Sequence, residues 1–342
     1  MDFSLTEAQS DLSALTRKIL ADRVTTWEPH GTGGFDAALW ATLARSGIVD
    51  AALPSSAGGG GFGLLEQCSV LIEIGRAVAP VPYLTSVVMA AAAVAEAGDG
   101  RLTEKWVVPV LRGEQTLAAA LDGFTASGSV LSGSQTAVPF GAFADGFLVA
   151  ASDRLFLVER SAPGVTVSAQ QTIDNADAAL LELDEVRAEP LPGSPEWVRL
   201  RGTVGVCAQQ LGVLERALEL TATYARERRQ FGHPIGSFQA VRQRLAEAYM
   251  DVDAVRLTLW QAAWQVLDGG QGAAETVATA KFWAAEAGHR VAHTAVHVHG
   301  GVGIDVDHPL HRYFAAAKRL EFTLGSGISH LRALGSLLAT QH

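Results

Sequence analysis

The chain has 342 residues, of which 48% are hydrophobic and 18% are charged, and its formal net charge is −10 at pH 7. A chain of this length can bury a large core, which predicts two or three sub-domains. The negative charge argues against a nucleic-acid partner, because binding to phosphates needs a basic surface. Cys68 and Cys207 lie far apart in the sequence. We interpret them as buried thiols in a reducing cytoplasm rather than as a disulfide framework.

No targeting or membrane-spanning segment is expected. The first twelve residues, MDFSLTEAQSDL, contain acids and no apolar core, unlike a signal peptide. The most apolar stretch, 87–97, is short and is followed by Gly98, Asp99 and Gly100. This pattern predicts a buried helix and not a membrane span.

Residues 1–115 are predicted to form an N-terminal helical domain. Thr6 stands before an apolar stripe with helical spacing, which is typical of a helix start. A glycine-rich break at 54–63 is followed by two further stretches with helical patterns, 64–78 and 84–97.

Residues 116–192 change to short apolar runs separated by turn residues. The runs at 147–150, 155–158 and 180–183 have the length of β-strands. They predict a small middle domain, a β-barrel or a sandwich. From about 193 to 342 the pattern is helical again, and long helices with apolar residues at three-to-four spacing predict an antiparallel four-helix bundle. The fold class is therefore multi-domain α+β, not an alternating α/β sheet.

The segment 224–240, YARERRQFGHPIGSFQA, is the most distinctive local pattern. Its first helix is predicted to end near Gln230, and Ser237 is predicted to cap the next one. Arg228 and Phe231 would share a face if helical geometry persisted. An arginine can bind a pyrophosphate while an aromatic ring packs on adenine. The alternative interpretation is a helix C-terminus whose cations complement the dipole.

Two further clusters have weaker implications. The sequence HGGVG at 299–303 places consecutive glycines after a helix, which lets a ligand approach the backbone closely. It lacks the residues of a P-loop and does not follow a strand, so it predicts neither that motif nor a Rossmann turn. His289, His293 and His297 lie four residues apart, but without a supporting acid or cysteine they are interpreted as helix-surface or interface residues, not metal ligands. No nucleophile motif is present.

Taken with the domain order, YARERRQFGHPIGSFQAVRQRLAEAY and HGGVG resemble the acyl-CoA dehydrogenases over nearly the whole chain. The tail, GGVGIDVDHPLHRYFAAAKRLEFTLGSG, is similar to the short subunits of actinobacterial enzymes of steroid side-chain breakdown. The resemblance implies FAD as cofactor and an acyl-CoA thioester as substrate. In this family a carboxylate removes the α-proton while the β-hydride passes to the flavin, and the FAD crosses a subunit interface.

Residue by residue, the resemblance implies a set of FAD contacts to the ADP half that a neighbouring protomer binds. The hairpin positions are Arg228, Gln230, Phe231 and Gln239, and the later positions are His297, where the family usually has glutamine, Gly300 and Gly301.

Other positions depart from the family pattern. Leu324 stands where the catalytic glutamate usually precedes a Gly-Thr or Gly-Ser pair, and the family's alternative base position falls near Gly202. The middle domain lacks the Thr-Glu-Pro-x-x-Gly-Ser-Asp segment that cradles the flavin. The Trp-Ile-Thr that usually faces the ring is replaced at 135–137 by Gln-Thr-Ala. No catalytic residue is therefore assigned, and Glu321 is the nearest alternative carboxylate.

The sequence therefore predicts a subunit of a heteromeric cytoplasmic enzyme, with an α2β2 assembly by analogy with the family. The partner, a second acyl-CoA dehydrogenase subunit, would supply the base and the flavin cradle. An electron-transfer flavoprotein would be the electron acceptor, as is common in this family. Two alternatives stay open: a self-sufficient homomeric dehydrogenase that uses Glu321, and a non-catalytic scaffold that binds no flavin.

Overall fold

The computed structural model describes residues 4–24, 34–51, 53–270 and 272–339. Residue contacts divide the chain into two compact units. We call 31–67 with 80–202 the sheet unit, and 1–30 with 68–79 and 203–342 the bundle unit. Two of the four chain boundaries between the units fall inside helices, and the three-domain division at 115 and 192 stays a prediction.

The helices of the sheet unit surround a fully buried stretch. The predicted helix at 84–97 is present, but Tyr83–Ala91 is a π-helix (η2) with all its residues buried, and only Ala92–Ala97 is an α-helix (α5). None of the helices in the described residues is both long and apolar enough to span a membrane. The other helices of this unit are α2 (Ala37–Arg45), α3 (Ile48–Ala51), η1 (Ser55–Ala57), α6 (Gly100–Leu102), η3 (Thr103–Val107) and α7 (Val108–Leu111).

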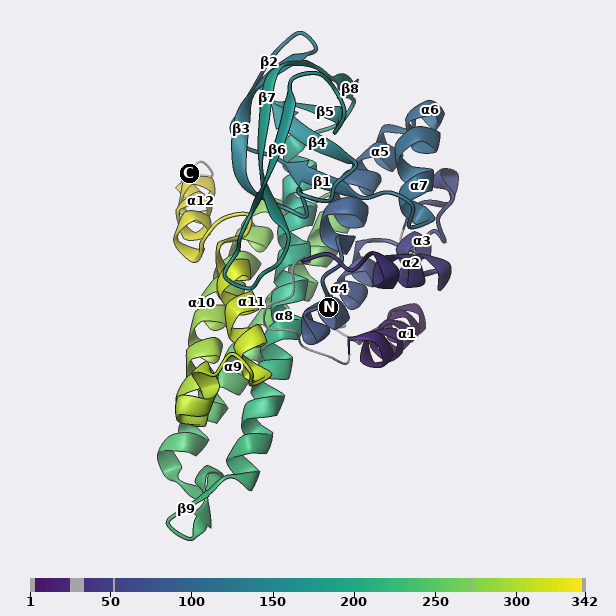
Figure 1. Ribbon diagram of the computed structural model, residues 1–342. Helices are drawn as coiled ribbons and strands as arrows, with labels where there is room; N and C mark the ends of the chain where they lie inside the picture. Colours follow the sequence, from purple (N-terminus) through teal and green to yellow (C-terminus); the bar gives the residue numbers. More distant parts are fainter. Residues whose placement is uncertain (1–3, 25–33, 52, 271, 340–342) are drawn as a thin grey trace. The chain divides into compact units, whose positions relative to one another are not determined.

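Two four-stranded sheets form the rest of the sheet unit (Figure 1). One has the order β1-β4-β5-β8, with β1 parallel to β4, and the other, β2-β3-β7-β6, is antiparallel. Buried side chains from both sheets, such as Phe147 and Leu181, form one core cluster, which confirms the predicted β domain. The strands are β1 (Leu117–Ala120), β2 (Phe124–Ser127), β3 (Val130–Pro139), β4 (Gly146–Ala151), β5 (Arg154–Glu159), β6 (Val165–Gln170), β7 (Ala178–Arg187) and β8 (Glu189–Leu191).

The bundle unit is built around long helices that run side by side in Figure 1. Helix α10 (Ala273–His299) packs against α9 (Gln239–Asp268), α11 (Leu310–Phe322) and α12 (Gly327–Ala339). Helix α1 (Glu7–Arg23) begins as predicted, because the side chains of Thr6 and Gln9 form a reciprocal capping box. Helices α4 (Leu64–Ala77) and α8 (Pro195–Glu227) begin in the sheet unit and end in the bundle unit.

Helices α4 and α8 approach each other through two glycines in the bundle unit. A Cβ atom added to Gly212 would lie 1.9 Å from the carbonyl oxygen of Ile72, and one added to Gly75 would lie 2.1 Å from that of Gln209. Real Cβ atoms do not approach backbone so closely, so the helices would have to move apart to accommodate a larger residue.

We therefore expect Gly212→Ala to lower the free energy of unfolding by about 1–3 kcal/mol, the usual cost of overpacking a tight core. Urea or thermal unfolding measures this change. Gly335→Ala is the matched control, because no atom lies within 4 Å of a Cβ at that position of α12. The control should be neutral or stabilising, since alanine favours a helix. Equal stability of the two variants would contradict the close approach.

Candidate functional site: an exposed hairpin and a glycine turn

A two-stranded hairpin links α8 to α9. Arg229–Gln230 (β9) pairs with His233–Pro234 (β10), and both turn residues, Phe231 and Gly232, have positive φ angles of 51° and 80°. Positive φ at both positions defines the tight hairpin turn, in which a non-glycine residue costs energy. Phe231 is 87% exposed, and its ring centroid lies 6.3 Å from that of Phe238. A strained, exposed aromatic side chain is a candidate for ligand or partner contact.

The hairpin corrects two local predictions. Helix α8 ends at Glu227, before Gln230, so Arg228 and Phe231 do not share a helical face. Ser237 does not cap α9: Phe238 is the N-cap residue, and the Ser237 hydroxyl donates instead to the carbonyl oxygen of Pro234 at 2.7 Å. The backbone pairing of β9 with β10 therefore fixes this segment, in place of the predicted helix extension and serine cap.

The arginines of this segment differ in what they bind. Arg226 donates to Thr223 at 3.1 Å, and Arg229 donates to the Gly232 carbonyl oxygen at 3.4 Å. The guanidinium of Arg228 is exposed and has no hydrogen bond or ion pair to any residue that the structure describes. It is therefore the cation of this group that is available to a ligand.

The glycine turn has an open side. Gly300 follows α10 with φ 65° and ψ −141°, a conformation that favours glycine. A Cβ at Gly300 or Gly301 would meet nothing within 4 Å, whereas one at Gly303 would lie 2.8 Å from the Val296 carbonyl oxygen. Gly303 therefore allows the short helix η5 (Gly300–Ile304) to pack against α10. The open backbone at 300–301 is accessible to a ligand.

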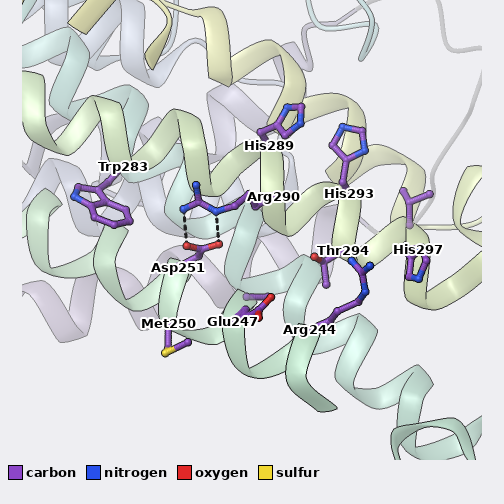
Figure 2. A pocket seen from close by; sticks show the side chains of 12 residues that line it. Arg244, Glu247, Met250, Asp251, Trp283, His289, Arg290, His293, Thr294 and His297 are labelled. Carbon is purple, nitrogen blue, oxygen red and sulfur yellow. Dashed lines mark hydrogen bonds and ion pairs between the residues drawn. The ribbon is translucent and has the colours of Figure 1, made fainter. Parts of the chain in front are cut away.

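A groove of about 780 Å³ lies between α9 and α10, and Figure 2 shows the side chains along it. The exposed His297 and Arg244 lie at one end, and Trp283 lies at the other. Arg290 is paired with Asp251, with nitrogen–oxygen distances of 2.6 and 2.9 Å. In this groove the charges of Arg290 and Asp251 therefore neutralise each other. Arg244 and His297 are not neutralised in this way by any residue that the structure describes.

The histidines on α10 lie where the helical spacing placed them. The rings of His289 and His293 are 4.5 Å apart, and burial, reinforced by the charges of His289 and Lys318, lowers the pKa of His293. Among the described residues, no three side chains of the metal-binding types gather into a metal site. Nδ1 of His289 lies 3.0 Å from the Lys318 ammonium and 3.6 Å from the Glu321 carboxylate, so the pair has one cation and one acid beside it.

The position of the expected base has no carboxylate. Leu324 follows α11 with a φ of 54°, and its carbonyl oxygen lies 2.8 Å from Nε2 of His330. The carboxylate of Glu321 is paired with Lys318 at 2.5 Å and lies 3.6 Å from Nδ1 of His289. One Glu321 oxygen is thus engaged by Lys318, and the other faces the ring of His289. Gly202, on buried backbone of α8, has no proton acceptor either.

Lys281 is a buried residue that the sequence did not single out. Its ammonium donates to the carbonyl oxygens of Leu320 and Glu321, both at 3.0 Å, at the C-terminal end of α11. Burial lowers its pKa to about 8, and the nearby thiol of Cys207 is itself raised to a pKa of about 12 by burial. Both cysteines are free and buried, as predicted.

In the sheet unit, the positions that would face a flavin ring are bonded within the unit. Only 121–123 connect β1 to β2, and there Arg199 binds the carboxylate of Asp122 at 2.8 Å and the Leu121 carbonyl oxygen at 2.9 Å. The side chain of Gln135 accepts from the Asp122 backbone N–H at 2.9 Å. The side chain of Gln170 accepts from the Ala137 N–H at 2.7 Å. The turn at 121–123 is therefore short and is held by side chains of the same unit.

Comparison with known proteins identifies the family. Residues 6–114 match the model of the acyl-CoA dehydrogenase N-terminal domain, and 201–336 match that of the C-terminal domain. The chain is 47% identical to the acyl-CoA dehydrogenase FadE27 of Mycobacterium tuberculosis, over 99% of both chains. It belongs to the acyl-CoA dehydrogenase family, whose enzymes use FAD.

Two solved structures are especially similar. A chain in the ChsE4-ChsE5 complex of Mycobacterium tuberculosis is 47% identical, with a TM-score of 0.93 and 99% of both chains covered. A chain of the Tcur3481-Tcur3483 steroid acyl-CoA dehydrogenase is 38% identical, with a TM-score of 0.91 and 98% of both chains covered. The observed order of helical, β and helical regions is that of the family, which confirms the predicted fold class.

Proposed function

We propose that this chain is a subunit of a heteromeric FAD-dependent acyl-CoA dehydrogenase. In this complex the chain would bind the ADP half of the FAD, and a catalytic partner subunit would bind the flavin ring. The observation that supports this most is an asymmetry within the chain. The side chains assigned to the ADP half are exposed and have no hydrogen bond or ion pair to any residue that the structure describes, while those assigned to the flavin half are bonded within the chain or replaced by an aliphatic side chain.

The residues of the ADP half fit a diphosphate ligand. Arg228 would form charge-assisted hydrogen bonds to the pyrophosphate, and Phe231 would pack on the adenine ring. Gln230, Gln239 and His297 are exposed polar residues that could add hydrogen bonds to the same ligand. The open backbone at Gly300 and Gly301 leaves room for close approach.

The flavin half fits poorly. A closed turn at 121–123 and an engaged Gln135 leave no cradle for the ring, and Leu324 has no lone pair for a proton. When bound, FAD accepts the substrate hydride. In our proposal the partner holds its ring and the base, and this chain binds and orients its far end.

The substrate class follows from the relatives. One is a steroid acyl-CoA dehydrogenase and another was solved as a two-protein complex. We therefore propose α,β-dehydrogenation of a steroid side-chain CoA thioester by an α2β2 complex in the cytoplasm, with an electron-transfer flavoprotein as electron acceptor.

Flavin retention separates this proposal from its two alternatives. The chain would be purified alone and, separately, after co-expression with an acyl-CoA dehydrogenase subunit that retains its catalytic carboxylate. Bound flavin would be measured by its absorbance at roughly 450 nm, where oxidised flavins absorb. We expect colour only after co-expression. Colour in the lone chain would support the homomeric enzyme, and no colour in either preparation would support the scaffold.

A further inference from the structure

An aromatic stack joins the ends of α8 and α10. The ring of Tyr224, on α8, lies 4.3 Å from the ring of His299, on α10, with 22° between their planes. The Tyr224 hydroxyl also donates to the His299 carbonyl oxygen at 3.5 Å. Tyr224 lies four residues before Arg228, and His299 directly precedes Gly300. The stack therefore connects the root of the hairpin to the root of the glycine turn.

His299 is held rigidly in this stack. It is 4% exposed, and its Nδ1 lies 2.8 Å from the Ala295 carbonyl oxygen. A carbonyl oxygen only accepts, so Nδ1 carries the hydrogen and the orientation of the ring is fixed. Burial lowers the pKa of His299, and the ring of His308, 5.3 Å away, lowers it further. The residue is thus a buried ring in a single orientation.

The hairpin is bonded directly to the turn of helix that contains Tyr224. The Arg228 backbone N–H donates to the Tyr224 carbonyl oxygen at 2.8 Å, and the Ile235 N–H donates to the Arg228 carbonyl oxygen at 2.8 Å. On the other side, Gly303 holds the glycine turn against α10. The stack therefore joins the helical turns from which the hairpin and the glycine turn start.

We propose that Tyr224 and His299 are positioning residues, which fix the hairpin and the glycine turn at one separation so that both bind the same ADP group. This inference rests on the proposed function. Neither residue needs to touch the cofactor. Their contribution is preorganisation: two binding elements on different helices are held in place before the ligand arrives, so less ordering opposes binding.

The first test compares Tyr224→Leu, which removes the stack, with Tyr224→Phe, which keeps the ring. In the complex with the partner, we expect the leucine variant to raise the FAD dissociation constant about 3- to 10-fold, the size of an aromatic pair contribution. The phenylalanine variant should stay within about twofold of wild type, because the 3.5 Å hydroxyl contact is long. Tyr249→Leu, at a 62% exposed position of α9, is the matched control and should change nothing.

The second test needs no cofactor. Amide hydrogen exchange of the lone chain should become faster at both 228–235 and 300–304 in Tyr224→Leu and also in His299→Leu. Exchange in the middle of α8 should stay unchanged, which shows that the fold is intact. Tyr224→Phe should exchange as wild type does, so rescue by the aromatic ring separates positioning from a general loss of stability.

Unchanged exchange at both segments in Tyr224→Leu would overturn the inference, as would a phenylalanine variant as defective as the leucine one. The FAD affinities of Arg228→Ala and Tyr224→Leu then distinguish a failure of the positioning role from a failure of the proposed function. If Arg228→Ala weakens FAD binding and Tyr224→Leu does not, the positioning role fails alone. If neither variant weakens binding, the proposed function fails with it.

Discussion

Purified without a partner, the chain should reduce no flavin with any acyl-CoA, even when FAD is added in excess. In our proposal Leu324 stands at the position of the usual proton acceptor, and an aliphatic side chain cannot take the α-proton. The segment 121–123 and Gln135, which we assign to the flavin half, are held by hydrogen bonds and an ion pair within the chain. Anaerobic flavin bleaching on addition of acyl-CoA measures this directly, with the complex as the positive preparation.

In the complex, Glu321→Gln should leave turnover within about twofold of wild type, because the partner supplies the working carboxylate. Removal of a general base from an active site costs roughly 10²–10⁴-fold in rate, so the two outcomes are well separated. Leu324→Glu should not give the lone chain activity, since the flavin contacts are missing as well. Turnover by the lone chain that disappears in Glu321→Gln would establish the homomeric enzyme instead.

The second large effect concerns Arg228. In the complex, Arg228→Ala should weaken FAD binding by about 1.5–3 kcal/mol, the contribution of a charge-assisted hydrogen bond, which is roughly a 10- to 150-fold higher dissociation constant. Titration of the flavin-free complex with FAD, followed by flavin fluorescence, gives this value.

Arg226→Ala is the matched control for that variant. It removes the same charge two residues away, but its guanidinium already binds Thr223. We expect its effect on FAD binding to stay below about threefold, because only long-range attraction is lost. Equal losses in the two variants would mean that the hairpin attracts the cofactor by general charge and not by a specific contact.

Much of the fold could be predicted because its signals are local. The Thr6 capping box, the helix that starts at Leu64 and the strand around 147–150 all follow from residue spacing and turn residues. The π-helical geometry of 83–91 could not be predicted, since all its residues are buried and a helix buried on every side shows no apolar spacing that would distinguish the two kinds. The early end of α8 was missed because hairpin pairing, not a helix stop signal, determines the conformation of Arg229 and Gln230.

The candidate site was predictable in its parts but not in its connections. The hairpin and the glycine turn were identified from short motifs, and Leu324 from a departure at one position. The stack of Tyr224 on His299, the Lys281 cap on α11 and the closure of the 121–123 turn by Arg199 each join residues far apart in sequence. Helical periodicity and motif spacing contain no information about such contacts.

The number of FAD molecules per complex tests the central claim most directly. If this chain contributes only the residues that bind the ADP half of FAD, and its partner contributes those that bind the flavin half, each pair of unlike subunits forms one complete FAD site. Flavin absorbance against total protein, with the subunit ratio fixed by mass measurement of the intact complex, should therefore give one FAD for every two chains. One FAD per chain would mean that this chain also holds a flavin ring of its own, and would contradict the account.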